Sequence, residues 1–516
     1  VVAEVLYLDL EPTVRKTTTD LLLDVGEPLV PFLLRYLASS RRYEGVVSAL
    51  PIRRKGAASA LYVLACSGKV RSADANAAIP RLVEALESQD YIRPPYRNDA
   101  LPLMACIARL WKNGAEVSPD MERRIEAMDS LHLYEPSEWQ KHQAYAVFWI
   151  KELHLESASQ ITPSDLERMR SLQVLESLHL DGSRLQLTAN WWGSLGKLKD
   201  LTTLSLSSTA VADEHLPLLR LTHLKELRLG GTAVTDSGLQ HLARLLDLEE
   251  LNLAQTQVTG RGFRYLTSLP HLEHVWLDGA PVTEAGLDAL TRLPQLEYLF
   301  LARTNLADNA APYIAAMSRL KGLSLAYTDI TDKALAQMGT LHNLGVLELD
   351  WTAVTGDGLR HLQRLTALWC LDLTHTAITD DALRYVGTMS GLKALNLSET
   401  PIGNQGLRSL GHLSQLIDLN LSKTGVTDKG LKYLAKLKAL DRLLLAGTGV
   451  RGPGLRYLAE LPHLKTLDLS YAEVDDSAVG HLVSVPRLTV LYIEGTNISE
   501  RGRARLKESL LPRALH

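Results

Sequence analysis

Leucines recur along most of the chain with a period of 24 residues. The frame LxxLxLxxTx(V/I)xxxGLxxLxxL keeps its register from Leu224 to Leu488. In the first half of each copy, apolar and polar residues alternate, as around Leu419 and Leu421. This alternation predicts a short β-strand with one buried face. The second half changes to helical spacing, as at Leu431 and Leu434, which predicts a helix on the opposite side of the coil.

A single copy cannot bury its own leucines, whereas stacked copies can, so the period predicts a solenoid. The frame resembles the leucine-rich repeats. This resemblance implies an α/β solenoid shaped as a horseshoe, with a parallel sheet on the concave face and helices on the convex face. Residues 150–500 would hold about fifteen copies, and residues 501–516 would form the C-terminal cap that an open solenoid requires.

One column of the frame departs from the family, which usually has Asn or Cys where this chain has Thr. The members of this column are Thr209, Thr232, Thr256, Thr304, Thr328, Thr352, Thr376, Thr400, Thr424, Thr448 and Thr496. A buried hydroxyl can satisfy turn backbone groups, so we expect a structural column. The frame is similar to the Thr-type repeats common in bacterial proteins. Within a copy, Thr427 or Asp428 is the expected helix N-cap.

Residues 1–149 follow a different, helical rhythm. Apolar segments at 13–24 and 29–37 are separated by Gly and Pro, and the same order returns at 54–66 and 77–86. This pattern resembles HEAT-type helical repeats, which implies an all-α solenoid ahead of the leucine-rich part. The strand pattern follows directly, so we expect a continuous core across the boundary and no flexible linker.

The strand positions that the leucine frame leaves exposed are the candidates for function. The copies from Leu272 to Leu368 hold three of the eight tryptophans and one of the four phenylalanines of the chain at such positions. Clustered exposed aromatics beside an arginine are typical of interface hot spots. We therefore predict a partner-binding patch made of His274, Trp276, Tyr298, Phe300, Arg303, Tyr327, Glu348, Asp350, Trp351, Trp369, Asp372 and His375. The alternative is that Tyr327 and Trp351 only fold over their neighbours and close the sheet edge.

Acidic residues outnumber basic ones on the exposed strand positions of these copies. The acidic ones are Glu273, Asp278, Glu297, Glu348, Asp350 and Asp372, against Arg303 and Lys321. Phosphate backbones need the opposite sign, so we do not expect nucleic acid. The expected partner is a protein or peptide of basic or mixed charge. A dense basic cluster at 41–55 is expected to be a solvated edge or, alternatively, a second partner site.

Catalysis has little support in the sequence. Glu348 and Asp372 occupy equivalent positions of adjacent copies, and with Asp350 and His375 nearby they suit acid–base work or a bound cation. Surface carboxylates are usually only solvated, and the chain has no nucleotide-binding glycine loop and no nucleophile elbow. We therefore expect no catalytic residue, no metal ligand and no cofactor.

Composition indicates the cellular compartment in which the chain is expected to act. The formal net charge is −4, and Cys66, Cys106 and Cys370 are isolated, which suits a reducing, cytoplasmic compartment. No run of 18 apolar residues predicts a membrane span. The main prediction is a non-catalytic protein-binding scaffold. Because the chain begins at Val1, the alternative is the sensing or substrate-recruiting part of a larger enzyme or a defence or signalling protein. A small-ligand or carbohydrate sensor is disfavoured by the open arc.

Overall fold

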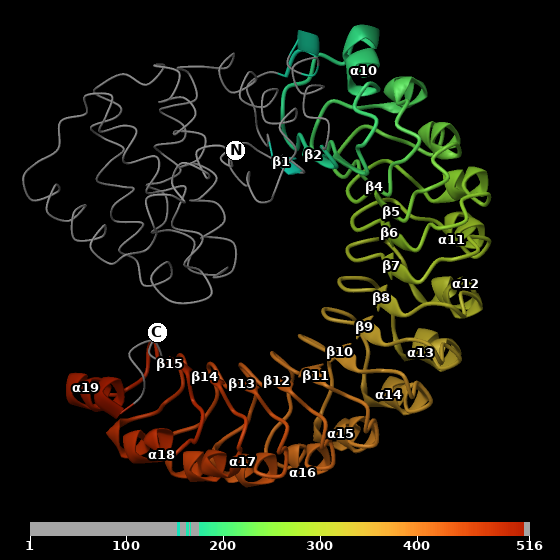
Figure 1. Cartoon of the computed structure of the whole chain (residues 1–516). Helices are drawn as coiled ribbons and strands as arrows, with labels where there is room; N and C mark the ends of the chain where they lie inside the picture. Colours follow the sequence, from blue (N-terminus) through green and yellow to red (C-terminus); the bar gives the residue numbers. More distant parts are fainter. Residues whose placement is uncertain (1–151, 155–160, 165, 167–174, 510–516) are drawn as a thin grey trace, which may run out of the picture. The chain divides into compact units, whose positions relative to one another are not determined.

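The computed structural model of the protein describes residues 152–154, 161–164, 166 and 175–509 (Figure 1). The chain divides into two compact units between Thr232 and Ala233. The predicted HEAT-like repeats and the basic cluster lie outside the described residues, as does the end of the predicted C-terminal cap. None of the described helices is long and apolar enough to cross a bilayer.

In the first unit, four short strands pair in parallel in chain order. They are β1 (Glu152–His154), β2 (Ser177–His179), β3 (Thr203–Ser205) and β4 (Glu226–Arg228), with helices α10 (Ala189–Leu195) and η4 (Asp213–Leu218) between them. Trp191 and Trp192 of α10 are fully buried and meet edge to face, with ring centroids 5.0 Å apart. These rings fill a locally wider core in place of leucines.

In the second unit, successive strands pair in parallel with a constant shift of one repeat, so that Leu371 lies between Leu347 and Leu395. The strands are β5 (Glu250–Asn252), β6 (His274–Trp276), β7 (Tyr298–Phe300), β8 (Gly322–Ser324), β9 (Val346–Glu348), β10 (Cys370–Asp372), β11 (Ala394–Asn396), β12 (Asp418–Asn420), β13 (Arg442–Leu444), β14 (Thr466–Asp468) and β15 (Val490–Tyr492). Within this unit the strands follow the inner side of the arc and the helices the outer side (Figure 1).

The helical half of each copy is short, and it is often a 3-10 turn. These elements are η5 (Gly238–Leu242), η6 (Arg261–Tyr265), α11 (Glu284–Leu290), η7 (Asp308–Ala310), α12 (Ala311–Ala316), α13 (Asp332–Met338), α14 (Gly356–Leu362), η8 (Asp380–Ala382), α15 (Leu383–Val386), α16 (Leu407–Leu410), α17 (Asp428–Leu434), η9 (Pro453–Glu460), η10 (Asp476–Ala478), α18 (Val479–Val483) and α19 (Glu500–Ser509). The last of these overlaps the predicted cap.

The core lies between the sheet and these helices. Leu347 and Leu349 from the strand half of a copy are fully buried, as are Leu359 and Leu362 from its helix. Burial of this kind contributes roughly 1.5–3 kcal/mol per leucine side chain, and it is available only when neighbouring copies are in place. The predicted α/β solenoid with a parallel sheet and flanking helices is thus confirmed for the described residues.

In the copies that carry it, the threonine column closes the turn that follows the strand, as predicted. The buried hydroxyl of Thr352 donates to the carbonyl of Leu349 at 2.6 Å, and that of Thr376 donates to the carbonyl of Leu373 at 2.6 Å. Each bond satisfies a carbonyl that water cannot reach. The contact stays within one copy, so this column consists of separate local caps.

A second polar column, on the helix side, does join neighbouring copies. The carboxylate of Asp332 accepts bonds from the Thr355 backbone N–H at 2.8 Å and from the Thr355 hydroxyl at 2.5 Å. Asp308 receives the same pair of bonds from Thr331. A Cβ on Gly358 would overlap the Asp332 carboxylate, which explains the glycine of the frame at this close approach.

Of the two residues expected as N-cap, the structure places Thr427 at that position, whereas Asp428 does not cap its own helix. Its carboxylate accepts backbone N–H bonds from Arg451, Gly452 and Gly454 in the next copy. Thr427 stands at the N-cap of α17 without a side-chain capping bond. In other copies the threonine does cap, as when Thr355 accepts a bond from the Asp357 N–H. The aspartate therefore links its copy to the next one, whereas the threonine caps the helix of its own copy.

Replacing Asp332 by Ala is expected to lower the free energy of unfolding by about 1–3 kcal/mol, because the Thr355 N–H loses its acceptor in a partly buried place. Urea unfolding followed by circular dichroism would measure the loss. Asp329→Ala, at an exposed residue of the same copy, is the matched control. Equal unfolding midpoints for the two variants would show that these inter-repeat bonds contribute no net stability.

Candidate functional site

The predicted patch residues lie on β6, β7, β9 and β10 and in the turns that follow the strands, except Trp369, which directly precedes β10. In each of these strands the middle residue is buried while the first and third are half-buried. The outer residues therefore face the inner side of the arc, as the alternation predicts. Strand β8 differs, because Gly322 and Ser324 are as buried as the leucine between them.

Four rings on β6 and β7 form one stacked cluster, which we call the sheet cluster. His274 stacks on Tyr298 with centroids 4.4 Å apart, and it also lies 5.8 Å from Trp276. Trp276 stacks on Phe300 at 5.1 Å with the two ring planes 1° apart. The Tyr298 ring also covers Gly322, where a Cβ would overlap it. Each ring holds the next in place, so their exposed faces are preorganised.

A second row of planar groups runs along the turns, and we call it the turn row. It consists of Arg303, Tyr327, Trp351 and His375, one from each of four successive copies. The guanidinium carbon of Arg303 lies 4.1 Å from the Tyr327 ring centroid. Tyr327 stacks on Trp351 at 5.3 Å, and Trp351 stacks on His375 at 3.4 Å. Tyr327 and Trp351 remain 39% and 42% exposed, so they both pack on their neighbours and present a face to solvent.

The backbone of the turn row is left-handed. Its four residues have φ between 54° and 58°, whereas Gly279 occupies the equivalent position with φ 66°. A bulky L-residue in this region costs on the order of 1 kcal/mol or more relative to glycine. Each stacking contact contributes about 0.5–1.5 kcal/mol, so the row roughly offsets its own strain. Large side chains therefore occupy a turn position that glycine could fill with less strain.

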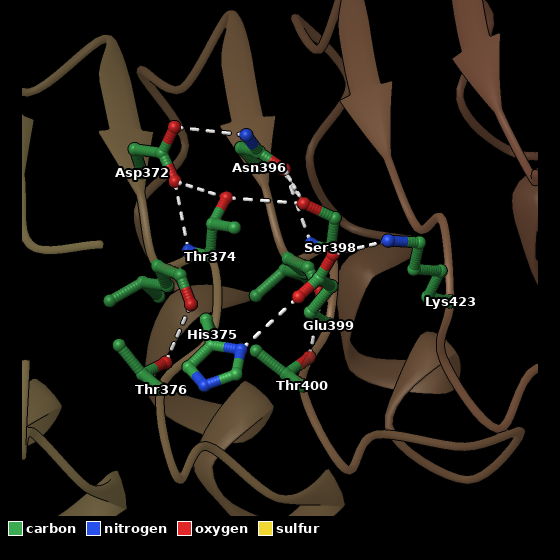
Figure 2. Close-up of polar contacts among 11 residues, drawn as sticks. Asp372, Thr374, His375, Thr376, Asn396, Ser398, Glu399, Thr400 and Lys423 are labelled. Carbon is green, nitrogen blue, oxygen red and sulfur yellow. Dashed lines mark hydrogen bonds and ion pairs between the residues drawn. The ribbon is translucent and has the colours of Figure 1, made fainter. Parts of the chain in front are cut away.

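The row continues into charged residues, which Figure 2 shows. His375 Nδ1 lies 3.1 Å from Glu399 Oε2, and Lys423 Nζ donates to Glu399 Oε1 at 2.7 Å. The bond from Lys423, followed by that from His375, lowers the pKa of the Glu399 carboxyl. Glu399 is therefore already paired within the protein.

Asp372 is also occupied within the protein. Its carboxylate accepts bonds from the Thr374 N–H at 2.8 Å, the Thr374 hydroxyl at 2.6 Å and the Asn396 amide at 2.9 Å (Figure 2). Asn420 and Asp468, at the same repeat position, also accept the N–H two residues on. Asp372 thus has the local turn-closing role of its column. It can still contribute charge to the surface, but its acceptor oxygens are engaged.

Four consecutive copies lack this turn-closing residue, and they are four of the five copies that hold the predicted patch. Their residues at that position are Trp276, Phe300, Ser324 and Glu348. The Ala302 N–H, which lies two residues after Phe300, is instead bound by Asp278 of the preceding copy at 2.9 Å. In this stretch of the sheet, the Asp or Asn that elsewhere accepts the turn N–H is therefore replaced, mostly by aromatic or acidic residues.

The acidic residues of the sheet fall into two groups. Some face a basic partner in the next copy, as Glu297 does with Lys321, Asp418 with Arg442 at 3.2 Å and Asp441 with Lys465. Asp278, Glu348 and Asp350 form no ion pair with any residue that the structure describes. They are carboxylates without a cation.

Burial and mutual repulsion act on these carboxylates. Burial, followed by the charges of Asp372 and Glu348, raises the pKa of Asp350 to about 6, although Arg303 opposes the shift. Burial also raises the pKa of Asp278, and Glu348 adds to the effect. A positively charged ligand would counter the repulsion and favour the ionised carboxylates. Asp278 was not among the predicted patch residues, although it and Asp350 occupy the same repeat position.

Two other observations limit the site. Trp369 is exposed and lies over Gly345, where a Cβ would come within 2.8 Å of its Nε1. It belongs to neither the sheet cluster nor the turn row. The Cys370 thiol has its pKa raised to about 11 by burial and by neighbouring carboxylates, so its nucleophilic thiolate is scarce at neutral pH. Within the described part of the chain, no three His, Cys, Asp or Glu side chains are grouped to hold a metal ion.

Comparisons with known proteins agree with this architecture. The family described as "Leucine-rich repeat region" matches residues 277–511, and that described as "Leucine Rich repeat" matches residues 220–243. No curated protein sequence matches the chain significantly.

Among solved structures, the chain is similar to a leucine-rich repeat protein of Leptospira interrogans, with 21% identity, a TM-score of 0.51 and coverage of 71% of this chain and 89% of that one. It is also similar to the mouse RP105/MD-1 complex, with 16% identity, a TM-score of 0.50 and coverage of 71% and 70%. At these identities the likeness concerns the fold alone. The family matches, supported by this likeness in fold, identify residues 220–243 and 277–511 as leucine-rich repeats.

Proposed function

We propose that the protein is a non-catalytic recognition module that binds a protein or peptide on the exposed face of β6 to β10. The observation that carries this proposal is that the sheet cluster and the turn row are held in place by stacking. They lie in the same copies as carboxylates that form no ion pair with a described residue. Leucine-rich repeat domains generally mediate protein–protein recognition. One similar structure, the mouse RP105/MD-1 complex, is an association of this kind.

The aromatic groups supply the affinity in this proposal. Trp, Tyr and Arg are the residues most enriched among interface hot spots, because they bury large areas and lose little conformational entropy. Here Trp276, Tyr327 and Trp351 are already held by stacking, so little further ordering is needed on binding.

The charges supply the preference for a partner. Asp278, Glu348 and Asp350 form no ion pair with a described residue, so carboxylates outweigh the basic groups Arg303 and Lys321 on this surface. This excess of negative charge favours a basic or mixed segment and disfavours nucleic acid, whose phosphates carry the same sign.

A catalytic role has no comparable support. The carboxylate oxygens of Asp372 accept hydrogen bonds from Thr374 and Asn396, so Asp372 does not form a free carboxyl pair with Glu348. Cys370 is protonated at neutral pH, and so it is no activated nucleophile. We therefore propose that the chain binds its partner without chemical change.

The double variant Trp276→Ser/Phe300→Ser is expected to weaken partner binding by at least tenfold, because it removes the exposed faces of the sheet cluster. The measurement is an affinity pull-down from a lysate of the source organism, with wild type and variant compared by quantitative mass spectrometry. Both residues are half-buried on the strand face, so circular dichroism should show an intact fold.

Tyr471→Ser is the matched control, because Tyr471 is a 64% exposed aromatic at the turn-row position of a copy outside the patch. It should leave recovery unchanged. Equal recovery of every polypeptide by wild type and the double variant would exclude the sheet cluster as the binding site.

Asp350→Asn is expected to stabilise the protein at neutral pH. The pKa of Asp350 in the folded chain, about 6, lies above its ordinary value of 3.8, so ionisation disfavours the folded state. This cost is complete above pH 6 and disappears below about pH 4, where the carboxyl is protonated in both states. The gain at pH 7.5 should be about 1 kcal/mol, discounted for a half-exposed group.

Thermal unfolding at pH 7.5 and pH 4 measures this effect, and Asp468→Asn on β14 controls for the loss of one charge. A gain for Asp350→Asn at pH 7.5 that fades at pH 4 would show a carboxylate retained at the expense of stability, as at many binding sites. An unchanged melting temperature at both pH values would contradict the described environment of Asp350.

A further inference from the structure

A row of basic residues lies on the helical side of the second unit, away from the strands. The position directly after the first leucine of the helical half is basic in five consecutive copies: Arg360, Arg384, Arg408, Lys432 and Arg456. We call this set the basic row. All five residues are exposed. Their helices, which run from α14 to η9, contact one another in chain order on the outer side of the arc (Figure 1).

Neighbouring rings, rather than carboxylates, hold most of these cations. The Arg384 guanidinium donates to the Tyr385 hydroxyl at 2.8 Å, and its central carbon lies 4.7 Å from the centre of that ring. Arg456 makes the same two contacts with Tyr457, at 3.0 Å and 4.8 Å. Lys432 Nζ lies 4.9 Å from the centre of the ring that follows it. A cation held in this way keeps its charge and its remaining N–H donors.

No member of the basic row forms an ion pair with a described residue. Other cations of the same copies do, as Lys438 does with Glu460 at 3.5 Å and Arg451 with Glu473 at 2.8 Å. The aspartate column of these helices is directed elsewhere, since the Asp428 carboxylate accepts backbone N–H bonds from the next copy. The row is therefore a line of cations without paired anions in the described part of the chain.

The charge is least opposed at the C-terminal end of the row. The residue three places before each cation is its neighbour on the helix surface. This residue is Asp357 in the first copy of the row and Asp381 in the second. In the other three copies it is not acidic: Gln405, Lys429 and Pro453. The last three members of the row therefore have no carboxylate at this neighbouring position.

The helices themselves do not require these cations. A basic residue near the C-terminal end of a helix interacts favourably with the helix dipole, which is the structural alternative. The four preceding copies, however, build the same repeat with other residues at this position: Arg264, Asp288, Pro312 and Ala336. In α11, the Asp288 carboxylate pairs with Arg292 at 2.8 Å. The position thus accepts acidic, neutral and basic residues, and a run of five cations is no condition of the fold.

The curvature of this side limits what the row can bind. A convex face curves away from a flat bilayer and from a stiff nucleic-acid duplex, so either would meet only part of the row. A flexible anionic chain can follow the curve. Single-stranded nucleic acids bind largely by stacking bases on free aromatic faces. The Tyr385 and Tyr457 rings are half-buried and already have a guanidinium over one face, which favours an anion without bases.

We propose that the basic row binds an acidic segment of a polypeptide in an extended conformation. Packed helices lie about 8–10 Å apart, and three residues of an extended chain span about 10 Å. A carboxylate at every third residue would therefore reach successive members of the row and form charge-assisted hydrogen bonds with them. This surface is separate from the patch on the strands, so the proposal does not depend on the function proposed above.

Three peptides of fifteen residues test the spacing. The first has Glu at every third position among Ser and Gly, the second has its five Glu residues together, and the third has Gln in place of the spaced Glu. Fluorescence polarisation measures their affinity for the full chain. We expect the spaced Glu peptide to bind about threefold tighter than the clustered one and at least tenfold tighter than the Gln peptide. Salt at about 0.5 M should remove these differences, because exposed charges are screened.

The triple variant Arg408→Gln/Lys432→Gln/Arg456→Gln removes the least opposed part of the row. It should weaken binding of the spaced Glu peptide at least tenfold. The three side chains are exposed, so circular dichroism should show an intact fold. An affinity equal to that of wild type would overturn the proposal.

The variant Arg261→Gln/Arg319→Gln/Lys333→Gln is the matched control. It removes the same number of exposed basic residues from the helical halves of copies that precede the row. The affinity for the spaced Glu peptide should stay within about twofold of wild type. A loss as large as that of the triple variant would show attraction to net charge alone and would refute a defined surface.

Other occupants are tested in parallel. A fifteen-nucleotide oligothymidylate and vesicles that contain phosphatidylglycerol are measured with wild type and the triple variant. Tighter binding of either one than of the spaced Glu peptide, lost in the triple variant, would replace the polypeptide as the occupant. Equal binding of the spaced and clustered Glu peptides would contradict the extended register.

The strand-face variant Trp276→Ser/Phe300→Ser separates this proposal from the function proposed above. It should bind the spaced Glu peptide as wild type does, because its substitutions lie on the opposite side of the repeat. Loss of peptide binding in this variant would place the peptide on the strand face, which would overturn the basic row and leave the recognition surface standing.

Discussion

The constant register between neighbouring strands is the constraint on which the rest of the second unit depends. Because Leu371 pairs with Leu347 and Leu395, every position of the repeat becomes a continuous column across the sheet. The leucine columns close the core, and the Asp332–Thr355 type of bond ties several copies to the next. The same constraint aligns surface residues, so a side chain interacts first with its counterparts in adjacent copies. Stability and the layout of the surface therefore have one origin.

The sequence was sufficient to predict the elements and their faces. Period-two leucines such as Leu347 and Leu349 place the residues between them on the exposed side, and the structure agrees. The sequence did not reveal how exposed side chains are used. Asp372 was predicted as a member of the partner-binding patch, and the structure shows that a local turn engages its oxygens, while Trp369 was grouped with rings that it does not join. Such outcomes depend on rotamers and on turn φ angles, which hydrophobic periodicity does not specify.

Three carboxylates without an ion pair accompany the aromatic groups of the candidate site. Asp418 on β12 and Glu297 next to β7 are paired with a basic residue of the next copy. Asp278, Glu348 and Asp350 form no ion pair with a described residue, and burial raises the pKa of Asp278 and Asp350, at some expense of folding free energy. The aromatic rows occupy the same copies. The coincidence of both features in one stretch is the main reason to regard it as a site.

The left-handed turn position has a consequence for how such a surface changes over generations. The turn accepts Gly279, Arg303 or Trp351 with nearly the same φ, so the residue there is free to vary while the backbone stays constant. Duplication of a 24-residue unit would add one more place to this row, and it would lengthen the row by one strand spacing of about 4.8 Å. The fold can therefore enlarge or rewrite its contact surface one side chain at a time, with no new architecture to evolve.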